Sequence, residues 1–256
     1  MASKLDETKA QVAAAHRVAA EAGMASGVMA TLGNISLRVP GDPGKFVVKG
    51  RGYAMDALAK MRAQDMVVCD LEGYLLEGPA GVTQCFEVKL HSCILKTHPE
   101  VNSVVHMHPR FAVLMSVLGA RIVPMCNMGN NLVRKPLPVY PHNKTITTDE
   151  EGMEVANMLG SNRAMLLLGH GAITVGKSLE ESVMGMLQLE EQAQMNWYAV
   201  CAAGPAHRHI PEEILAESDS RPPLSQLPHF KGPMAKGIPQ VNGAWMYYAD
   251  QVAREP

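Results

Sequence analysis

Four residues from three separate parts of the chain have side chains that bind divalent metals in proteins. His106 and His108 lie two positions apart in VVHMH, whose branched residues favour a strand, so both rings are expected on one face. Glu87 opens a predicted helix, and His91 follows one turn later on the same side. His170 lies between two glycines, which leave room for a ligand to approach. Three imidazoles and one carboxylate suit one divalent ion, with manganese, zinc, cobalt and iron all compatible.

Each of these patterns alone is also common in histidines that only pack or face solvent. The pair His207 and His209 has the same spacing as the first pair, but it lies in a Pro-rich tail without a strand pattern. We interpret this second pair as solvated surface. His91 has three interpretations: a partner that orients Glu87, an alternative proton carrier, or a buried structural histidine.

The hydrophobic pattern predicts the elements that position these residues. Helical spacing over residues 86–97 ends at His98-Pro99, and a strand over 101–108 follows at once. Pro109 is expected as the first residue of a helix over 109–119. Ser178 and Glu181 predict a capping box for a helix that runs to about residue 200. The other expected elements are an opening helix that ends between 22 and 27, hairpins over 31–50 and 66–78, a helix over 143–160, and strands on both sides of Gly169-His170-Gly171.

The composition is that of an ordinary globular chain. A length of 256 residues favours one domain with one sizeable core. Lys plus Arg number 23 against 25 Asp plus Glu, and this balance excludes non-specific attraction to nucleic acid or to an anionic membrane. The first residues lack the apolar run of a signal peptide, and no apolar stretch approaches the roughly 20 residues that cross a bilayer, so we expect the protein to be neither exported nor membrane-spanning. Scattered cysteines without a CxxC pair indicate reduced thiols, so a cytoplasmic location is expected.

The order of several motifs resembles the class II aldolase and adducin-like family. The matching motifs span about residues 10–200 and are GNIS at 33–36 followed by Arg38, KGRG at 49–52, MVVCDLEG, Glu87 with His91, PEVNSVVHMHP and LLLGHGAITVG. The resemblance implies an α/β fold, a three-layer α/β/α sandwich on a mixed, mainly antiparallel sheet. It also implies a homotetramer with active sites at subunit interfaces.

The resemblance also implies roles for individual residues. The metal ligands would be His106, His108 and His170, and Glu87 would be the acid/base residue that can also touch the metal. The catalytic domain is expected over residues 1–204, because the chain turns Pro-rich and irregular beyond it. Residues 205–256 are expected to form an extension that packs on this domain or on a neighbouring subunit. Its aromatic residues would either cover the active site or anchor the tail, and they are Trp245, Tyr247 and Tyr248.

Two departures separate the chain from the sugar-phosphate aldolases of this family. Those enzymes bind phosphate with GNxS, a Thr-Gly loop and a Ser-Ser pair, whereas this chain has KGRG and Cys85-Phe86. The tyrosine that aldolases contribute across the interface has no match, since Asn127 falls near its place. Arg51 offers a planar fork suited to a carboxylate, and Phe86 offers an apolar face suited to an aromatic ring. The whole pattern looks most like decarboxylases of hydroxylated aromatic dicarboxylates, such as 3,4-dihydroxyphthalate or hydroxy-methylpyridine-dicarboxylate.

The sequence therefore predicts a carboxy-lyase, a metal-dependent, non-oxidative decarboxylase of an ortho-hydroxylated aromatic dicarboxylate. The metal would chelate the hydroxyl and the neighbouring carboxylate, and Glu87 or His91 would act in proton transfer. The expected substrate contacts are Asn34, Ser36, Arg51 and Phe86. One alternative is a class II aldolase or epimerase that acts on a sugar phosphate. The other is a non-catalytic, adducin-like interaction domain.

Overall fold

The protein is built on one mixed sheet. The computed structural model describes residues 3–223, 226–230, 242–254 and 256, and in these residues the strands follow the order β4-β3-β2-β1-β6-β9-β8-β7, with β5 paired to β2. Neighbouring strands are antiparallel, except that β7 and β8 are parallel. The strands are β1 (Asn34–Val39), β2 (Asp42–Arg51), β3 (Met66–Asp70), β4 (Leu75–Glu77), β5 (Thr83–Gln84), β6 (Ser103–Met107), β7 (Val139–Tyr140), β8 (Ala164–Leu167) and β9 (Gly171–Gly176).

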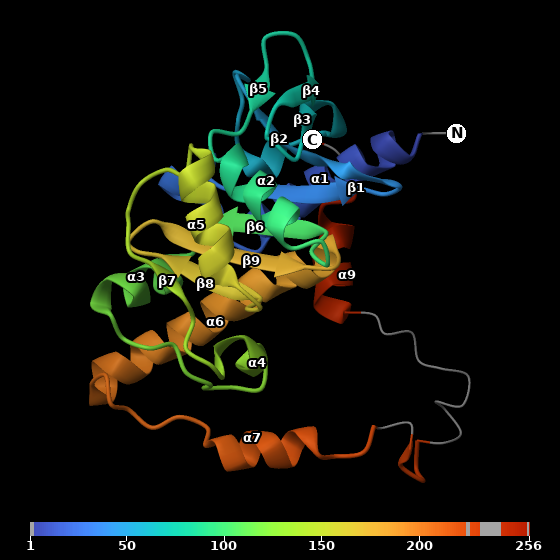
Figure 1. Cartoon of the computed structure of the whole chain (residues 1–256). Coiled ribbons are helices and arrows are strands. Elements are labelled where there is room, and N and C mark those ends of the chain that lie inside the picture. The colour runs from blue at the N-terminus through green and yellow to red at the C-terminus, as the bar shows by residue number, and fades with distance from the viewer. Residues whose placement is uncertain (1–2, 224–225, 231–241, 255) are drawn as a thin grey trace.

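Helices cover both faces of this sheet (Figure 1). Val105 and Met107 of β6 share a core with the helices on one face, and Val104 shares a second core with the helices on the other. The first face carries α1 (Lys4–Glu21), α3 (Arg110–Leu118) and α6 (Leu179–Ala203), and the second carries α2 (Val88–Thr97) and α5 (Asp149–Leu159). The chain thus has the predicted three-layer α/β/α fold on a mixed, mainly antiparallel sheet. Shorter helices are η1 (Gly27–Met29), η2 (Leu58–Lys60), η3 (Ala63–Asp65) and α4 (Asn130–Val133).

The start of α3 differs from the prediction by one residue. Pro109 is the N-cap residue of α3 and has extended backbone angles, so it is not the first helical residue. Proline has no side-chain acceptor for the free N–H groups of the first turn. The carboxylate of Glu190 on α6 accepts these hydrogen bonds instead, from the backbone N–H groups of Phe111 and Ala112, both at 2.9 Å. A side chain distant in sequence thus caps the helix that follows His108.

The predicted helix over residues 143–160 is wrong in its first part. Helix α5 begins at Asp149, because Thr148 and Glu151 close a capping box: the Thr148 hydroxyl accepts from Glu151 N at 3.3 Å, and the Glu151 carboxylate accepts from Thr148 N at 3.2 Å. Residues 143–148 therefore form a loop. At the start of α6 the predicted box is only half formed, since Ser178 caps Glu181 N at 3.1 Å but the Glu181 carboxylate accepts from Lys177 N at 2.7 Å.

The predicted C-terminal extension contains α7 (Glu212–Asp219) and α9 (Gly243–Gln251). Arg134 forms ion pairs with Glu212 and Asp219 of α7. Trp245 and Tyr248 of α9 are partly buried against the core beside α1. Residues 224–225, 231–241 and 255 of the extension lie outside the described residues, and the division at residue 204 stays a prediction. None of the described helices combines the length and the apolar character needed to cross a membrane.

Candidate metal centre

The fold brings together the four residues that the sequence singled out. Glu87 is the N-cap residue of α2, His106 lies on β6, His108 directly follows β6, and His170 lies in the turn between β8 and β9. One ligand atom from each of the four lies within 4.8 Å of the others. The convergence depends on the pairing of β6 with β9, which places His106 opposite Ile173.

The Glu87 carboxylate lies between two of the histidines. Its Oε2 atom is 3.0 Å from His106 Nε2, and its Oε1 atom is 3.6 Å from His170 Nε2. The ring centroid of His108 is 4.8 Å from that of His106 and 5.1 Å from that of His170. Glu87 Oε1 also accepts a hydrogen bond from the backbone N–H of Ile146 at 3.3 Å. All four donor groups therefore face a common point.

Backbone carbonyl groups orient two of the imidazole rings. His106 Nδ1 lies 3.1 Å from the oxygen of Ala172, and His170 Nδ1 lies 3.1 Å from the oxygen of Lys144. In each ring Nδ1 donates to the carbonyl, so Nε2 is the ring nitrogen directed at Glu87. This is the arrangement that metal-ligating histidines usually show.

The local electrostatics fit ligands for a cation. Burial raises the pKa of Glu87, but His106, His170 and the Ile146 N–H outweigh it and lower the pKa to about 2. Burial, together with His106 and His170, lowers the pKa of His108 to about 3. Burial lowers the pKa of His106, but the ion pair with Glu87 outweighs it and the net shift is upward. At neutral pH the carboxylate is ionised and His108 is neutral, as metal ligands must be.

A divalent ion fits this donor set. His108 Nδ1 is buried and has no hydrogen-bond partner among the described residues. Leaving a buried nitrogen without a partner costs free energy, which a bound cation nearby can offset. Three imidazoles and one carboxylate also match the predicted cofactor, one divalent metal ion. The donor types do not select among manganese, zinc, cobalt and iron.

A cavity of about 350 Å³ opens beside the four residues. Three of the predicted substrate contacts line it, and they are Asn34, Arg51 and Phe86. The guanidinium of Arg51 packs over the Phe86 ring, 5.2 Å from its centroid, and forms an ion pair with Asp56. Asn34 Oδ1 and Arg51 Nε are buried without a partner among the described residues, so both are available to a bound molecule.

Ser36 and His91 lie outside the residues that line this cavity. Both are fully buried, and Ser36 Oγ is hydrogen-bonded to His91 Nδ1 at 2.8 Å. Burial lowers the pKa of His91 to about 3, so its ring is neutral. Ser36 is thus a partner of His91 in this structure, and a direct contact with substrate is not favoured for it.

The structure adds functional candidates that the sequence did not reveal. Asp56 bridges two cations of the KGRG loop, Lys49 at 2.7 Å and Arg51. Asn143 and Thr145 line the cavity from the loop at 143–148. No motif marks Asp56, and the sequence pattern predicts a helix at the residues of this loop.

A larger cavity of about 640 Å³ lies between α1, the β1–β2 turn, the start of α6 and α9, and it contains none of the predicted site residues.

Comparison with known proteins gives the same family as the motifs. Residues 10–197 match the model of the Class II Aldolase and Adducin N-terminal domain. The chain is 31% identical to a 3,4-dihydroxyphthalate decarboxylase of Arthrobacter keyseri, with 80% of this chain and 84% of that protein covered. It is 30% identical to a 5-methylthioribulose-1-phosphate/5-deoxyribulose-1-phosphate aldolase of Rhodospirillum rubrum, over 68% and 75% of the two chains.

A solved structure confirms the fold. The crystal structure of an aldolase II superfamily protein from Pseudomonas syringae superimposes with a TM-score of 0.76 at 21% identity, covering 99% of this chain and 95% of that one. Decarboxylases and aldolases both cleave carbon–carbon bonds, and this chain is a lyase, as the sequence predicted. With the family model matched over most of its length, the chain belongs to the class II aldolase and adducin family.

Proposed function

We propose that the protein is a metal-dependent, non-oxidative decarboxylase of an ortho-hydroxylated aromatic dicarboxylate. The observation that carries this proposal is the pair of Arg51 and Phe86, with the guanidinium over the ring, which lines the same cavity as Glu87, His108 and His170. The similarity to a 3,4-dihydroxyphthalate decarboxylase supports the same substrate class. An anion-binding group and an aromatic face beside a metal-binding cluster suit a small aromatic acid.

The metal-binding residues of the proposal are His106, His108, His170 and Glu87. A divalent cation bound there would supply a Lewis acid that withdraws charge from an ortho hydroxyl and the neighbouring carboxylate. The protein supplies the fixed orientation of the rings through the oxygens of Ala172 and Lys144. These hydrogen bonds keep the Nε2 atoms of His106 and His170 directed at Glu87 before any ligand binds.

Arg51 would bind the second carboxylate of the substrate. Lys49 and Arg51 share the single carboxylate of Asp56, so this trio carries one excess positive charge. Arg51 Nε has no partner among the described residues, and guanidinium groups bind carboxylates with two parallel hydrogen bonds. Asn34 lies opposite His106 in the sheet and offers an amide to the same substrate. The contact with Arg51 would select diacids over monoacids.

Glu87 is the proposed proton carrier. Its low pKa means that it enters the reaction as a carboxylate and first has to gain a proton. The ortho hydroxyl of the substrate can give that proton on binding, and Glu87 can return it to the ring carbon after carbon dioxide leaves. The product oxygen then regains a proton from water, which balances the overall reaction. His91 remains the second catalytic candidate, and its neutral, buried ring fits a residue that orients Glu87.

The quaternary structure and location belong to the same proposal. Apolar side chains are exposed in the single chain: Val28, the residue before the cavity-lining Met29, is 92% exposed, and Phe86 is 64% exposed. Such side chains support the predicted homotetramer, in which a neighbouring subunit would cover the site. All the described cysteines are free thiols, which supports a cytoplasmic location.

Release of carbon dioxide is the direct test of the proposed function. The metal-loaded protein is expected to release carbon dioxide from 3,4-dihydroxyphthalate, or from another ortho-hydroxylated aromatic diacid in a small panel. The same preparation should not cleave ketose phosphates. Release of an aldehyde from a ketose phosphate, without carbon dioxide from any diacid, would show that the protein is an aldolase instead.

His106→Ala is expected to abolish stoichiometric metal binding and activity together, because it removes one of three clustered imidazoles. Elemental analysis should find about one divalent ion per chain in the parent protein and in the control variant His209→Ala, which replaces an exposed histidine of the tail. Circular dichroism should show that both variants fold. Full metal occupancy in folded His106→Ala would remove this residue from the metal centre.

Glu87→Gln is expected to lower kcat by about 100-fold or more while the protein keeps most of its metal, because an amide cannot carry the proton. The amide oxygen still accepts from the Ile146 N–H, which limits the structural effect. Steady-state kinetics with metal content measured on the same sample checks this. Normal turnover would exclude Glu87 as the proton carrier.

Arg51→Ala is expected to lower kcat/KM for diacids by about 10–100-fold, the effect of one lost hydrogen-bonded charge contact. Monoacid analogues should lose little, so the ratio between diacid and monoacid kcat/KM measures the specificity directly. Arg62→Ala serves as a control, since Arg62 is not among the residues that line the cavity. An unchanged ratio in Arg51→Ala would place the second carboxylate elsewhere.

A further inference from the structure

The loop at residues 143–148, called the ligand loop below, contacts two of the proposed metal ligands through its backbone. The oxygen of Lys144 binds His170 Nδ1 at 3.1 Å, and the N–H of Ile146 donates to Glu87 Oε1 at 3.3 Å. Asn143 adds a third contact, because its side-chain amide donates to the oxygen of Leu168 at 3.2 Å, two residues before His170. The loop thus fixes the ring orientation of one ligand and the carboxylate of another.

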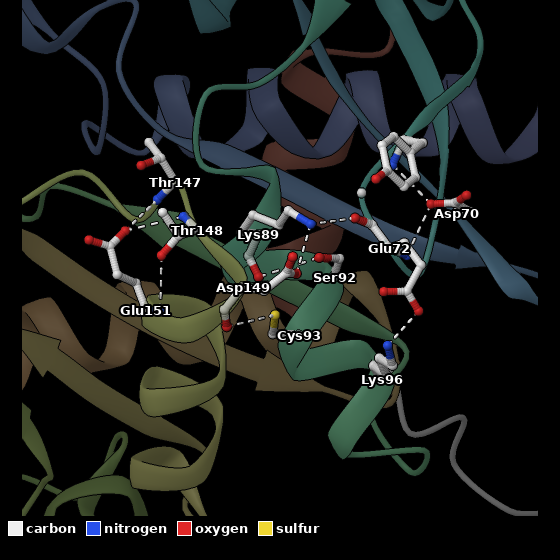
Figure 2. A network of polar contacts seen from close by, with 12 residues as sticks. Asp70, Glu72, Lys89, Ser92, Cys93, Lys96, Thr147, Thr148, Asp149 and Glu151 are labelled. Atoms are coloured by element: carbon white, nitrogen blue, oxygen red, sulfur yellow. Dashed lines mark hydrogen bonds and ion pairs between the residues drawn. The ribbon is translucent and has the colours of Figure 1, made fainter.

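The carboxylate of Glu151 binds the ligand loop at several residues. Glu151, in the first turn of α5, accepts from the N–H groups of Thr147 at 2.9 Å and Thr148 at 3.2 Å (Figure 2). Its other oxygen lies 3.0 Å from Lys144 Nζ. Glu151 therefore contacts the loop at three residues, including the one whose carbonyl binds His170. The Thr147 N–H and Lys144 lower the pKa of Glu151 to about 2, so its carboxylate is ionised at neutral pH.

We propose that Glu151 is a positioning residue of the metal centre: its carboxylate holds the ligand loop, and the loop in turn orients His170 and Glu87. The inference rests on the proposed metal centre and extends it to a residue that touches neither metal nor substrate. Without the carboxylate, the N–H groups of Thr147 and Thr148 lose their partners and the loop can relax away from the ligands. Loss of partners outside the ligand shell typically weakens metal binding by about 10–100-fold.

A purely structural role is the competing explanation, since Glu151 also belongs to the capping box of α5. Thr148 provides a matched control for this role. Its hydroxyl accepts from Glu151 N at 3.3 Å, so Thr148→Ala weakens the start of α5 but leaves the three carboxylate contacts in place. If Glu151 acts only as a cap, Glu151→Ala and Thr148→Ala will lower the melting temperature and neither will change metal affinity.

Zinc affinity of the metal-stripped full-length protein tests the inference. In calorimetric titrations with Zn²⁺, Glu151→Ala is expected to bind about 10–100-fold more weakly than the parent protein, and Thr148→Ala to bind within about threefold of it. Glu151→Gln keeps one oxygen acceptor and should lie between the two. Should Glu151→Ala fail to fold, Glu151→Gln decides: parent-like affinity in it overturns the inference, and weakened affinity supports it.

The outcomes separate this inference from the metal centre itself. If the parent protein binds none of Zn²⁺, Mn²⁺, Co²⁺ and Fe²⁺, the proposed metal centre fails and the inference fails with it. If the parent protein binds Zn²⁺ tightly and Glu151→Ala binds it equally well, only the positioning role is overturned. Glu150→Ala adds a second control, because Glu150 is an exposed residue of the same helical turn.

Discussion

The structure of the site depends on one buried carboxylate. Glu87 is only 6% exposed, and an ionised carboxylate in that position would be strongly unfavourable without partners. Its partners are His106, His170 and the N–H of Ile146. They come from β6, from the turn between β8 and β9, and from the loop before α5, so the carboxylate connects the sheet with the layer of α2 and α5. A cation at the same point would strengthen this arrangement, since it adds an opposite charge to a buried anion.

The register of the central strands is a functional constraint for the same reason. In β6, His106 faces α2 and α5, whereas Val105 and Met107 pack into the core with α1, α3 and α6. A slip of one residue would exchange the two faces and place the imidazole in that apolar core. The register also sets Asn34 opposite His106 on one side and Ile173 on the other. The pairing that builds the hydrophobic cores therefore also aligns the side chains of the cavity.

The sequence predicts the parts of the site that follow a regular period. VVHMH reveals the face of His106 because branched residues impose a strand and a strand alternates, and the ordered motifs resemble one family. The loop at 143–148 has no such period, and only the Thr148–Glu151 capping box shows why the helix begins later. Glu190 caps a helix that lies far earlier in the chain, and Asp56 lies in a loop without periodicity. No local sequence pattern therefore marks either residue. Ser36 lies in the GNIS motif that predicts a substrate contact, but its hydroxyl is hydrogen-bonded to His91. Both side chains are fully buried, and buried polar groups need such partners.

The site combines a shell for a cation with a group that can bind an anion. Three histidines and Glu87 form the shell, and the rings of His106 and His170 are oriented by their hydrogen bonds to the oxygens of Ala172 and Lys144. Arg51, which lines the same cavity, shares the carboxylate of Asp56 with Lys49, and its guanidinium lies over the Phe86 ring. A planar cation on an aromatic ring presents its edge to a carboxylate and leaves an apolar surface beside it. The decarboxylase proposed above would use both features, the cation to hold the hydroxyl and its neighbouring carboxylate, and Arg51 to hold the second carboxylate.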